Sequence, residues 1–249
     1  MMTCTNHTNA LVSTALALAL ATALPAPASA QRVEEQASFD FVIKGISAAT
    51  LSFSGVQDGN RYAVSGVVKS AGLAALFRKI SYTAEARGAV SGSKYTPASY
   101  TETSDNGKRK SQSKMSYSRG VPSAVQYTPP REGRDKDVNP ASQGGTVDTL
   151  TALYAILRDV DAGQECKVSL KMYDGRYVST IAVSNPKKKG DGVICSGQYR
   201  RVDGFKPEEM AERTKFPFTV RYVPLGDGRM QVTEVVMQSI YGNAALKRR

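Results

Sequence analysis

The amino-acid sequence predicts a mainly β protein, built as a large curved antiparallel sheet or partly closed barrel with one or two helices on its concave face. Three observations predict this fold class. Apolar and polar residues alternate with a period of two in segments from residue 39 to residue 222. Dipeptides that favour tight hairpins separate these segments. Only two stretches show helical spacing instead.

The predicted strands carry apolar side chains on one face and polar side chains on the other, as in an antiparallel sheet with one solvated face. The alternation is clearest in residues 39–44, 61–69, 80–87, 167–172 and 216–222. Turn signals fall at residues 58–60, 106–107, 174–175, 185–186 and 226–228. Their number predicts roughly ten or more strands.

The longer helix is predicted over residues 147–158. Thr146 can cap it, and Asp148 would stand in the first turn, where an acid is favourable. The apolar residues that recur at helical spacing are Val147, Leu150, Leu153, Tyr154 and Leu157. Such a helix either plugs the concave face, which we favour, or forms a mobile lid over a pocket.

A second, shorter helix and one long loop complete the predicted order. The spacing of Leu73, Leu76, Phe77 and Ile80 predicts one or two helical turns that lead into a strand. Residues 128–145 form a polar loop without periodicity, which is either functional or disordered. No internal repeat separates domains, so we expect one β-rich domain over residues 31–249.

The first thirty residues resemble a secretory signal peptide. They contain no Lys, Arg, Asp or Glu, and residues 11–24 form an apolar core that ends before Ala28-Ser29-Ala30. The core is shorter than the roughly 20 residues of a membrane span. We expect cleavage after Ala30 and a periplasmic location. A buried N-terminal helix is the alternative, because no basic residue precedes the core.

Composition excludes several catalytic classes. The only histidine, His7, lies in the predicted leader, and the sequence has no tryptophan. The processed chain therefore cannot use a Ser-His-Asp triad, a Cys-His pair or a zinc site with histidine ligands. We expect no enzyme activity, no metal and no cofactor. A hydrolase that uses carboxylates or tyrosines is the weakest of three functional hypotheses.

Two cysteines remain after the predicted cleavage, Cys166 and Cys195, and an oxidising compartment favours a disulfide between them. Residues 165–173, 176–183 and 192–202 are expected to form a three-stranded meander, which puts the cysteines on its outer strands. Those strands lie about 9.5 Å apart, whereas bonded cysteines have Cα atoms closer than about 7 Å. The bond therefore needs a sharp curl of the sheet or one cysteine beyond its strand; two reduced, buried cysteines are the alternative.

The charge of the chain favours anionic partners. The formal net charge is +11, which attracts lipid head groups or other anionic envelope components. Export makes nucleic acid the least expected partner, and contact with a membrane would be peripheral at most. The candidate contacts are the basic clusters Lys108, Arg109, Lys110 and Lys187, Lys188, Lys189, the latter in a loop after Asn185-Pro186. Each cluster could equally be an ordinary solvated rim.

Two acidic residues have ordinary explanations beside functional ones. Asp174-Gly175-Arg176 could present a carboxylate and a guanidinium to a ligand, but a hairpin turn accounts for it. Asp148 could be a buried functional carboxylate, but an acid in the first turn of a helix is common.

Five segments together resemble the bacterial family of domain of unknown function 3108. They are residues 41–46, 147–154, 173–176, 199–205 and 216–237, and the resemblance spans most of residues 38–246. It implies an exported envelope protein of unassigned role. It also implies a fold similar to the curved sheet with plugging helices of periplasmic lipoprotein carriers. The family supplies no catalytic residues to transfer.

The leading functional hypothesis is a non-enzymatic envelope protein that binds a lipid or acyl chain against the concave face. The candidate lining residues are Phe39, Phe41, Phe53, Tyr82, Leu153 and Tyr154. The second hypothesis is a structural or interaction protein that supports the envelope with a fully packed core and no cavity.

Overall fold

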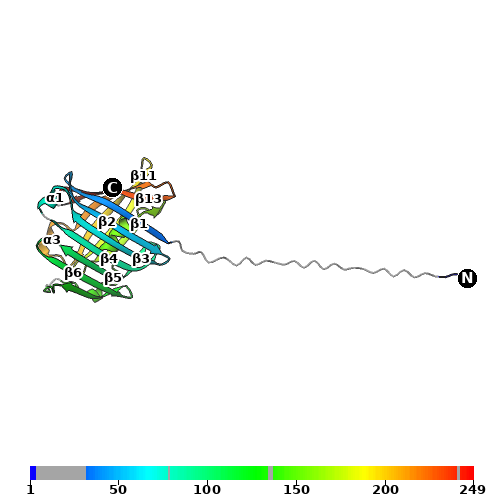
Figure 1. Cartoon of the computed structure of the whole chain (residues 1–249), viewed down its shortest axis with the longest axis horizontal. Helices are drawn as coiled ribbons and strands as arrows, with labels where there is room; N and C mark the ends of the chain where they lie inside the picture. The colour runs from blue at the N-terminus through cyan, green and yellow to red at the C-terminus, as the bar shows by residue number, and fades with distance from the viewer. Residues whose placement is uncertain (4–31, 78, 134–136, 240–241) are drawn as a thin grey trace.

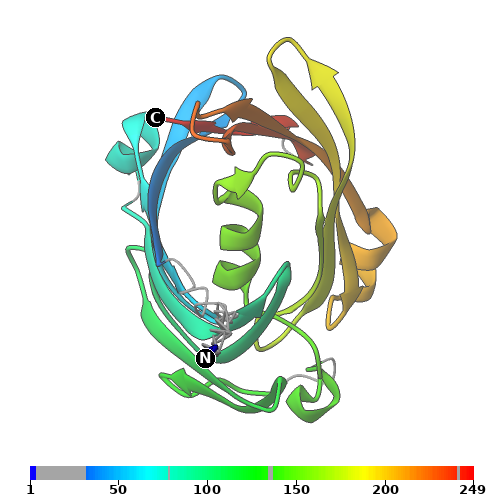
Figure 2. The ribbon, with the colours of Figure 1, turned by 90° about the vertical axis from the view of Figure 1, so that its right-hand side faces the viewer.

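The computed structural model describes residues 1–3, 32–77, 79–133, 137–239 and 242–249. The predicted leader and its cleavage site lie almost wholly outside the described residues. The other described residues fold as one 14-stranded antiparallel sheet that curls around a helix without closing, which confirms the predicted fold class (Figure 1, Figure 2).

Hairpins connect most neighbouring strands, so the spatial order follows the chain. The order across the sheet is β7-β6-β5-β4-β3-β2-β1-β14-β13-β12-β11-β10-β9, and the short β8 pairs with β13. The first half comprises β1 (Val33–Ile43), β2 (Ile46–Asp58), β3 (Arg61–Ser70), β4 (Ser81–Ser91), β5 (Lys94–Asp105), β6 (Lys110–Ser118) and β7 (Val121–Thr128). The second half comprises β8 (Val160–Asp161), β9 (Val168–Tyr173), β10 (Val178–Lys189), β11 (Gly192–Asp203), β12 (Lys215–Pro224), β13 (Arg229–Ser239) and β14 (Gly242–Arg248).

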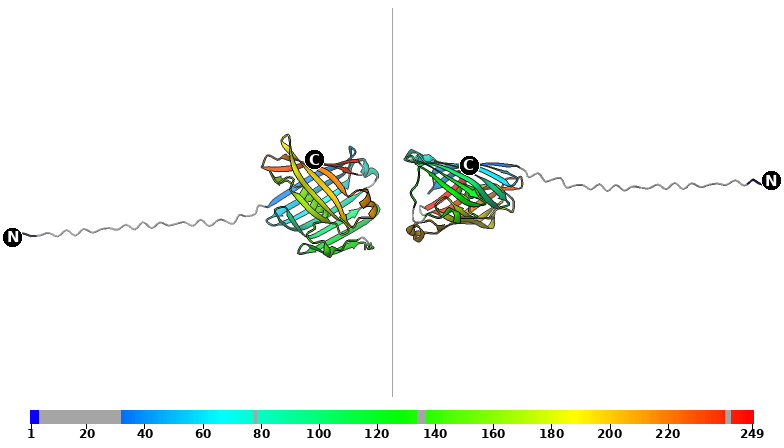
Figure 3. Two further views of the ribbon diagram at one scale, coloured as in Figure 1. Left: turned by 180° about the vertical axis from the view of Figure 1, so that it is seen from behind. Right: turned by 90° about the horizontal axis from the view of Figure 1, so that it is seen from below.

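Both predicted helices form, but only one lies inside the sheet. Figure 2 shows α2 (Thr149–Leu157) inside the ring of strands, so the interpretation as a plug fits its position. The short α1 (Gly72–Phe77) follows β3 and stands on the rim, with Leu76 and Phe77 exposed. A third helix, α3 (Pro207–Glu212), joins β11 to β12. Figure 3 shows the β10–β13 side of the sheet, with α1 and α3 at one end.

The cap of α2 differs from the prediction. Asp148, not Thr146, is the N-cap: its Oδ1 accepts a hydrogen bond from the Thr151 backbone N–H at 2.8 Å. The Thr146 hydroxyl instead donates to the Gln143 carbonyl at 2.7 Å. Asp148 satisfies a donor that the first helical turn leaves free, which is why the helix begins there.

The long loop predicted at residues 128–145 lies between the two edge strands, β7 and β9. It contains the short η1 helix (Pro140–Ser142). The Gly145 N–H donates to Gly120 after β6, and Val147 exchanges hydrogen bonds of 2.9 Å with Lys171 and Tyr173 of β9. In its described part the connection therefore bridges the gap that strand pairing leaves open.

The disulfide between Cys166 and Cys195 is present, with Cα atoms 5.4 Å apart. Cys195 lies in β11, whereas Cys166 precedes the first residue of β9. The geometric objection from the meander is thus resolved by a cysteine that lies beyond its strand. Residues 185–186 interrupt the β10–β11 register opposite Cys195.

The predicted turn at Asn185-Pro186 is wrong. These residues lie within β10 as an irregularity between Ser184 and Lys187, with Asn185 at φ +55. The chain turns after β10, where Gly190 has φ +64. Lys187, Lys188 and Lys189 therefore belong to the exposed end of a strand rather than to a loop.

Candidate functional site

Helix α2 divides the concave space into a packed side and an open side. On the packed side, a Cβ atom at Gly55 of β2 would collide with the Tyr154 ring, and one at Gly66 of β3 would lie 2.7 Å from Leu150 Cδ1. Glycine at these two positions lets the helix approach β2 and β3 closely. Little space is left on that side.

Aromatic rings fill the packed side further. Phe53 meets the Tyr154 ring edge-on at 5.7 Å and stacks at 6.4 Å against Phe39, while Tyr95 meets the Tyr154 ring edge-on at 6.3 Å. All four side chains are buried. Edge-to-face and offset stacking at these distances stabilise a core beyond the area that they bury.

A buried polar network fixes the start of α2. The Thr151 hydroxyl donates to Asp148 Oδ2 at 2.7 Å and lies 2.8 Å from the Tyr62 hydroxyl. Burial raises the pKa of Asp148 to about 6, although the two hydrogen bonds from Thr151 oppose this rise. Asp148 is thus a structural cap in a dry environment.

A second buried carboxyl holds the end of α2. Glu35 of β1 accepts a hydrogen bond from the Asp159 N–H at 2.7 Å. Burial raises the pKa of Glu35 to about 7; the bond to Asp159 and the nearby guanidinium groups of Arg158 and Arg248 oppose the rise. Arg248 is held by Asp159 at 2.9 Å.

The open side of α2 is an apolar cavity of about 510 Å³, within the range of ligand pockets. Its walls come from α2, β1 and β10–β14. The lining residues are Phe41, Leu153, Ile156, Leu157, Ile181, Tyr199, Arg201, Phe205, Phe216, Phe218, Val235, Met237, Ala244, Ala245 and Leu246.

Among the described residues that line this cavity, Arg201 is the one charged residue. Its guanidinium lies 5.0 Å from the centre of the Phe216 ring and 5.4 Å from that of Phe205. It also donates to the Arg213 carbonyl at 3.0 Å, next to α3. Stacking on two rings orients the charge beside an apolar wall.

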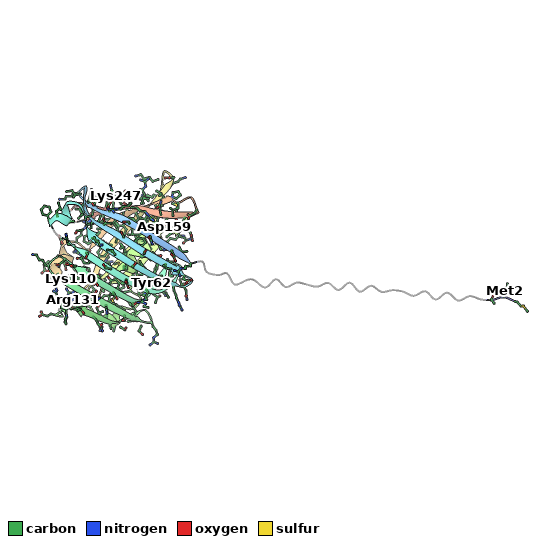
Figure 4. The ribbon with its side chains drawn as sticks, viewed as in Figure 1. Met2, Tyr62, Lys110, Arg131, Asp159 and Lys247 are labelled. Atoms are coloured by element: carbon green, nitrogen blue, oxygen red, sulfur yellow. A yellow bond between two sulfur atoms is a disulfide. The ribbon has the colours of Figure 1, made fainter. Side chains whose placement is uncertain are left out.

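A polar cavity of about 530 Å³ opens at the start of α2, where Thr149 contributes to its wall. Arg109, Arg131 and Arg176 line it together with Asp174. The Asp174 carboxylate accepts hydrogen bonds from the Arg176 and Tyr177 N–H groups in the β9–β10 turn, so it acts as a turn residue. Figure 4 shows Lys110 and Arg131 at the end of the molecule where α3 lies.

One aromatic stack joins the two cavities. The Tyr177 ring, which lines the polar cavity, stacks at 4.5 Å on the Phe205 ring, which lines the apolar one. A molecule with an apolar chain and a polar head group could place its chain in the apolar cavity and its head group in the polar one.

The structure distributes the six residues considered for ligand lining over three environments. Phe41 and Leu153 line the apolar cavity. Phe39, Phe53 and Tyr154 belong to the packed side. Tyr82 of β4 is 40 % exposed and lies outside the cavity lining.

The two basic clusters lie at opposite ends of the sheet. Lys108, Arg109 and Lys110 belong to the β5–β6 turn and the start of β6, and Arg109 lines the polar cavity. Lys187, Lys188 and Lys189 project at the tip of the β10–β11 hairpin. The predicted ligand-lining and anionic-contact residues did not include Arg201 and Phe205, although both lie in residues 199–205, one of the segments that carry the family resemblance.

Other site types find no support in the described residues. No group of three or more His, Cys, Asp or Glu side chains in the described part of the chain could hold a metal ion. None of the helices in that part is both long and apolar enough to span a membrane.

Comparison with known proteins identifies a family and a similar solved structure. The family model described as "Protein of unknown function (DUF3108)" matches residues 37–210. A crystal structure of a beta-barrel-like protein of domain of unknown function DUF1849 from Brucella abortus is similar over 86 % of this chain and 94 % of that chain, with 11 % identity and a TM-score of 0.43. No curated protein matches the sequence.

Proposed function

Because the chain belongs to the DUF3108 family, whose function is unknown, we propose a function from its own geometry. The protein is a non-enzymatic component of the cell envelope that binds a hydrophobic or amphiphilic ligand, such as a lipid or an acyl chain. The observation that carries this proposal is the apolar cavity between α2 and the β10–β14 wall.

The chemistry of the cavity suits an acyl chain. Leu153 and Ile156 of α2 face Phe216, Phe218 and other apolar side chains across the space. Burial of each methylene group of a ligand there contributes about 0.8 kcal/mol. Arg201 would meet an anionic head group, and the polar cavity beyond the Tyr177–Phe205 stack offers further cations.

Export to the periplasm is part of the proposal. The Cys166–Cys195 disulfide supports it, because such bonds persist mainly in oxidising compartments. Cleavage after Ala30 would be tested by N-terminal sequencing of the protein recovered from a periplasmic extract. An uncleaved chain that begins with Met1 and is recovered in the cytoplasmic fraction would contradict export.

Titration of the delipidated protein with a fluorescent fatty acid, dansyl-undecanoic acid, tests the ligand. We expect saturable binding at one site and displacement by unlabelled palmitate. The variant Ala244→Phe fills the cavity, and we expect it to weaken binding at least tenfold. Ala124→Phe on the exposed outer face of β7 is the control and should bind as the wild type does.

The result also separates the proposal from its rival, a structural protein that supports the envelope without a ligand. That rival is favoured by the tight packing around Tyr154. Absence of saturable binding, or equal binding by Ala244→Phe and wild type, would favour the structural role.

A further inference from the structure

Large apolar side chains are exposed at the rim formed by α1 and the start of β2. The α1 sequence, Gly72-Leu73-Ala74-Ala75-Leu76-Phe77, contains no polar side chain. Leu76 is 80 % exposed and Phe77 is 88 % exposed. At the first residue of β2, Ile46 is 56 % exposed. We call these three side chains the apolar rim.

The backbone holds α1 in this exposed position. The Ala71 N–H donates to the Ala48 carbonyl of β2 at 3.0 Å. Gly72 has φ +56, and a Cβ atom there would lie 2.8 Å from the Ser47 carbonyl oxygen. A six-residue helix has little stability of its own. Its attachment to β2 therefore presents Leu76 and Phe77 to the outside.

Ile46 connects the apolar rim to the face of the sheet that carries the apolar cavity. Ile46 pairs with Ile43 of β1, and Ile43 pairs with Ala244 of β14, which lines the cavity. Residues that pair directly across antiparallel strands share a face of the sheet. Figure 1 shows α1 and α3 at the same end of the sheet, opposite the end where β1 begins.

The chain segments that carry the apolar rim contain basic residues and no acidic residue. The sequence has no acidic residue between Asp40 and Asp58 or between Asp58 and Glu85. These two segments include Lys44 in the β1–β2 turn and Lys79, two residues after the end of α1. Exposed apolar side chains flanked by basic ones suit the interface of an anionic bilayer.

We infer that the apolar rim docks on an anionic lipid bilayer. Leu76, Phe77 and Ile46 enter the boundary between head groups and acyl chains, and the flanking lysines contact lipid phosphates. Docking in this orientation places the cavity end of the sheet at the membrane surface. The inference stands on the rim itself, while exchange of a ligand between membrane and cavity rests on the proposed function.

Fluorescence of a single tryptophan tests insertion, because the natural chain has none. In Phe77→Trp, we expect a blue shift of the emission when vesicles of phosphatidylglycerol and phosphatidylcholine are added. The control Leu225→Trp places the probe in the β12–β13 turn at the opposite end, and its emission should not change. An unchanged emission of Phe77→Trp with saturating vesicles would overturn the inference.

Sedimentation with sucrose-loaded vesicles measures the affinity. We expect the double variant Leu76→Ser/Phe77→Ser to lose at least tenfold in partitioning, while Leu225→Ser binds as wild type. Loss of binding on substitution of Lys187, Lys188 and Lys189 instead, with the rim variant unaffected, would assign docking to the opposite end. A wild-type dimer in solution that the rim variant dissociates would show that a second copy covers the rim.

Binding of dansyl-undecanoic acid without vesicles distinguishes the two proposals. The rim variant should retain it, because neither Leu76 nor Phe77 lines the apolar cavity. If the wild type binds no fatty acid but inserts into vesicles, the result contradicts the proposed binding of a lipid ligand and supports docking of the apolar rim on the membrane.

Discussion

Glu35 offers a test of how burial at the end of α2 affects stability. Its side chain is 8 % exposed and accepts a hydrogen bond from the Asp159 N–H. Burial raises its pKa from an ordinary 4.5 to about 7. The folded protein therefore binds a proton more tightly than the unfolded chain, so this group stabilises the fold most at low pH.

The sign and size of the effect follow from this pKa. The stabilising contribution is complete below about pH 4.5 and is lost as the pH rises through 7. At about 1.4 kcal/mol per pKa unit, the loss is on the order of 3 kcal/mol. Glu35→Gln keeps an oxygen for the Asp159 N–H and removes the proton equilibrium. The difference in free energy of unfolding between variant and wild type should therefore rise by about 3 kcal/mol from pH 4.5 to pH 7.5.

Urea unfolding followed by far-UV circular dichroism at several pH values measures this difference. Other groups that titrate in the same range contribute equally to both proteins, so their contributions cancel in the difference. Asp148 is one of them, because burial raises its pKa to about 6. Glu34→Gln is the control, since the Glu34 side chain is 64 % exposed. A difference for Glu35→Gln that stays constant with pH would refute the reasoning.

Three further predictions concern packing and cross-links. Gly55→Ala should lower the free energy of unfolding by about 1–3 kcal/mol, because its methyl group collides with the Tyr154 ring. The control Gly144→Ala makes only ordinary contacts and should cost little. Equal thermal midpoints for these two variants would contradict the close approach of α2 to β2. Thr151→Val removes the hydroxyl that hydrogen-bonds Asp148 Oδ2 and the Tyr62 oxygen in the interior, and should cost about 1–3 kcal/mol in urea unfolding. Tyr62→Phe should cost less, and the reverse order would be inconsistent with the network. The double variant Cys166→Ala/Cys195→Ala should lose about 3–4 kcal/mol of unfolding free energy, as expected for a loop of 29 residues. The reduced wild type should unfold like this variant. If neither protein is less stable than the oxidised wild type, the disulfide does not stabilise the fold.

Local sequence determined most of the secondary structure of this protein. Period-two alternation predicted the strands at residues 39–44, 61–69, 80–87, 167–172 and 216–222, because a strand with one buried face alternates apolar and polar side chains. The helical spacing of Leu150, Leu153, Tyr154 and Leu157 likewise predicted α2. The family was also identified from the sequence, and the match over residues 37–210 confirms it.

Local signals failed where pairing across the sheet decided the outcome. Asn185-Pro186 has the composition of a turn, yet β11 continues to pair beyond it and the chain turns only after Lys189. Thr146 and Asp148 are both good capping residues, and the bond from Thr151 selects Asp148. The spacing of residues 72–80 predicted a helix but not its place, since nothing local distinguishes a buried apolar helix from one held on a rim.

The concave face and its plugging helix could thus be predicted from the sequence, and the position of the cavity could not. Phe41 and Leu153 line it, whereas Phe53 and Tyr154, equally apolar in sequence, pack against each other. The tertiary structure decided between them through Gly55 and Gly66, which admit the helix closely on the β2–β3 side. Because the helix lies against that wall, the space remains on the other.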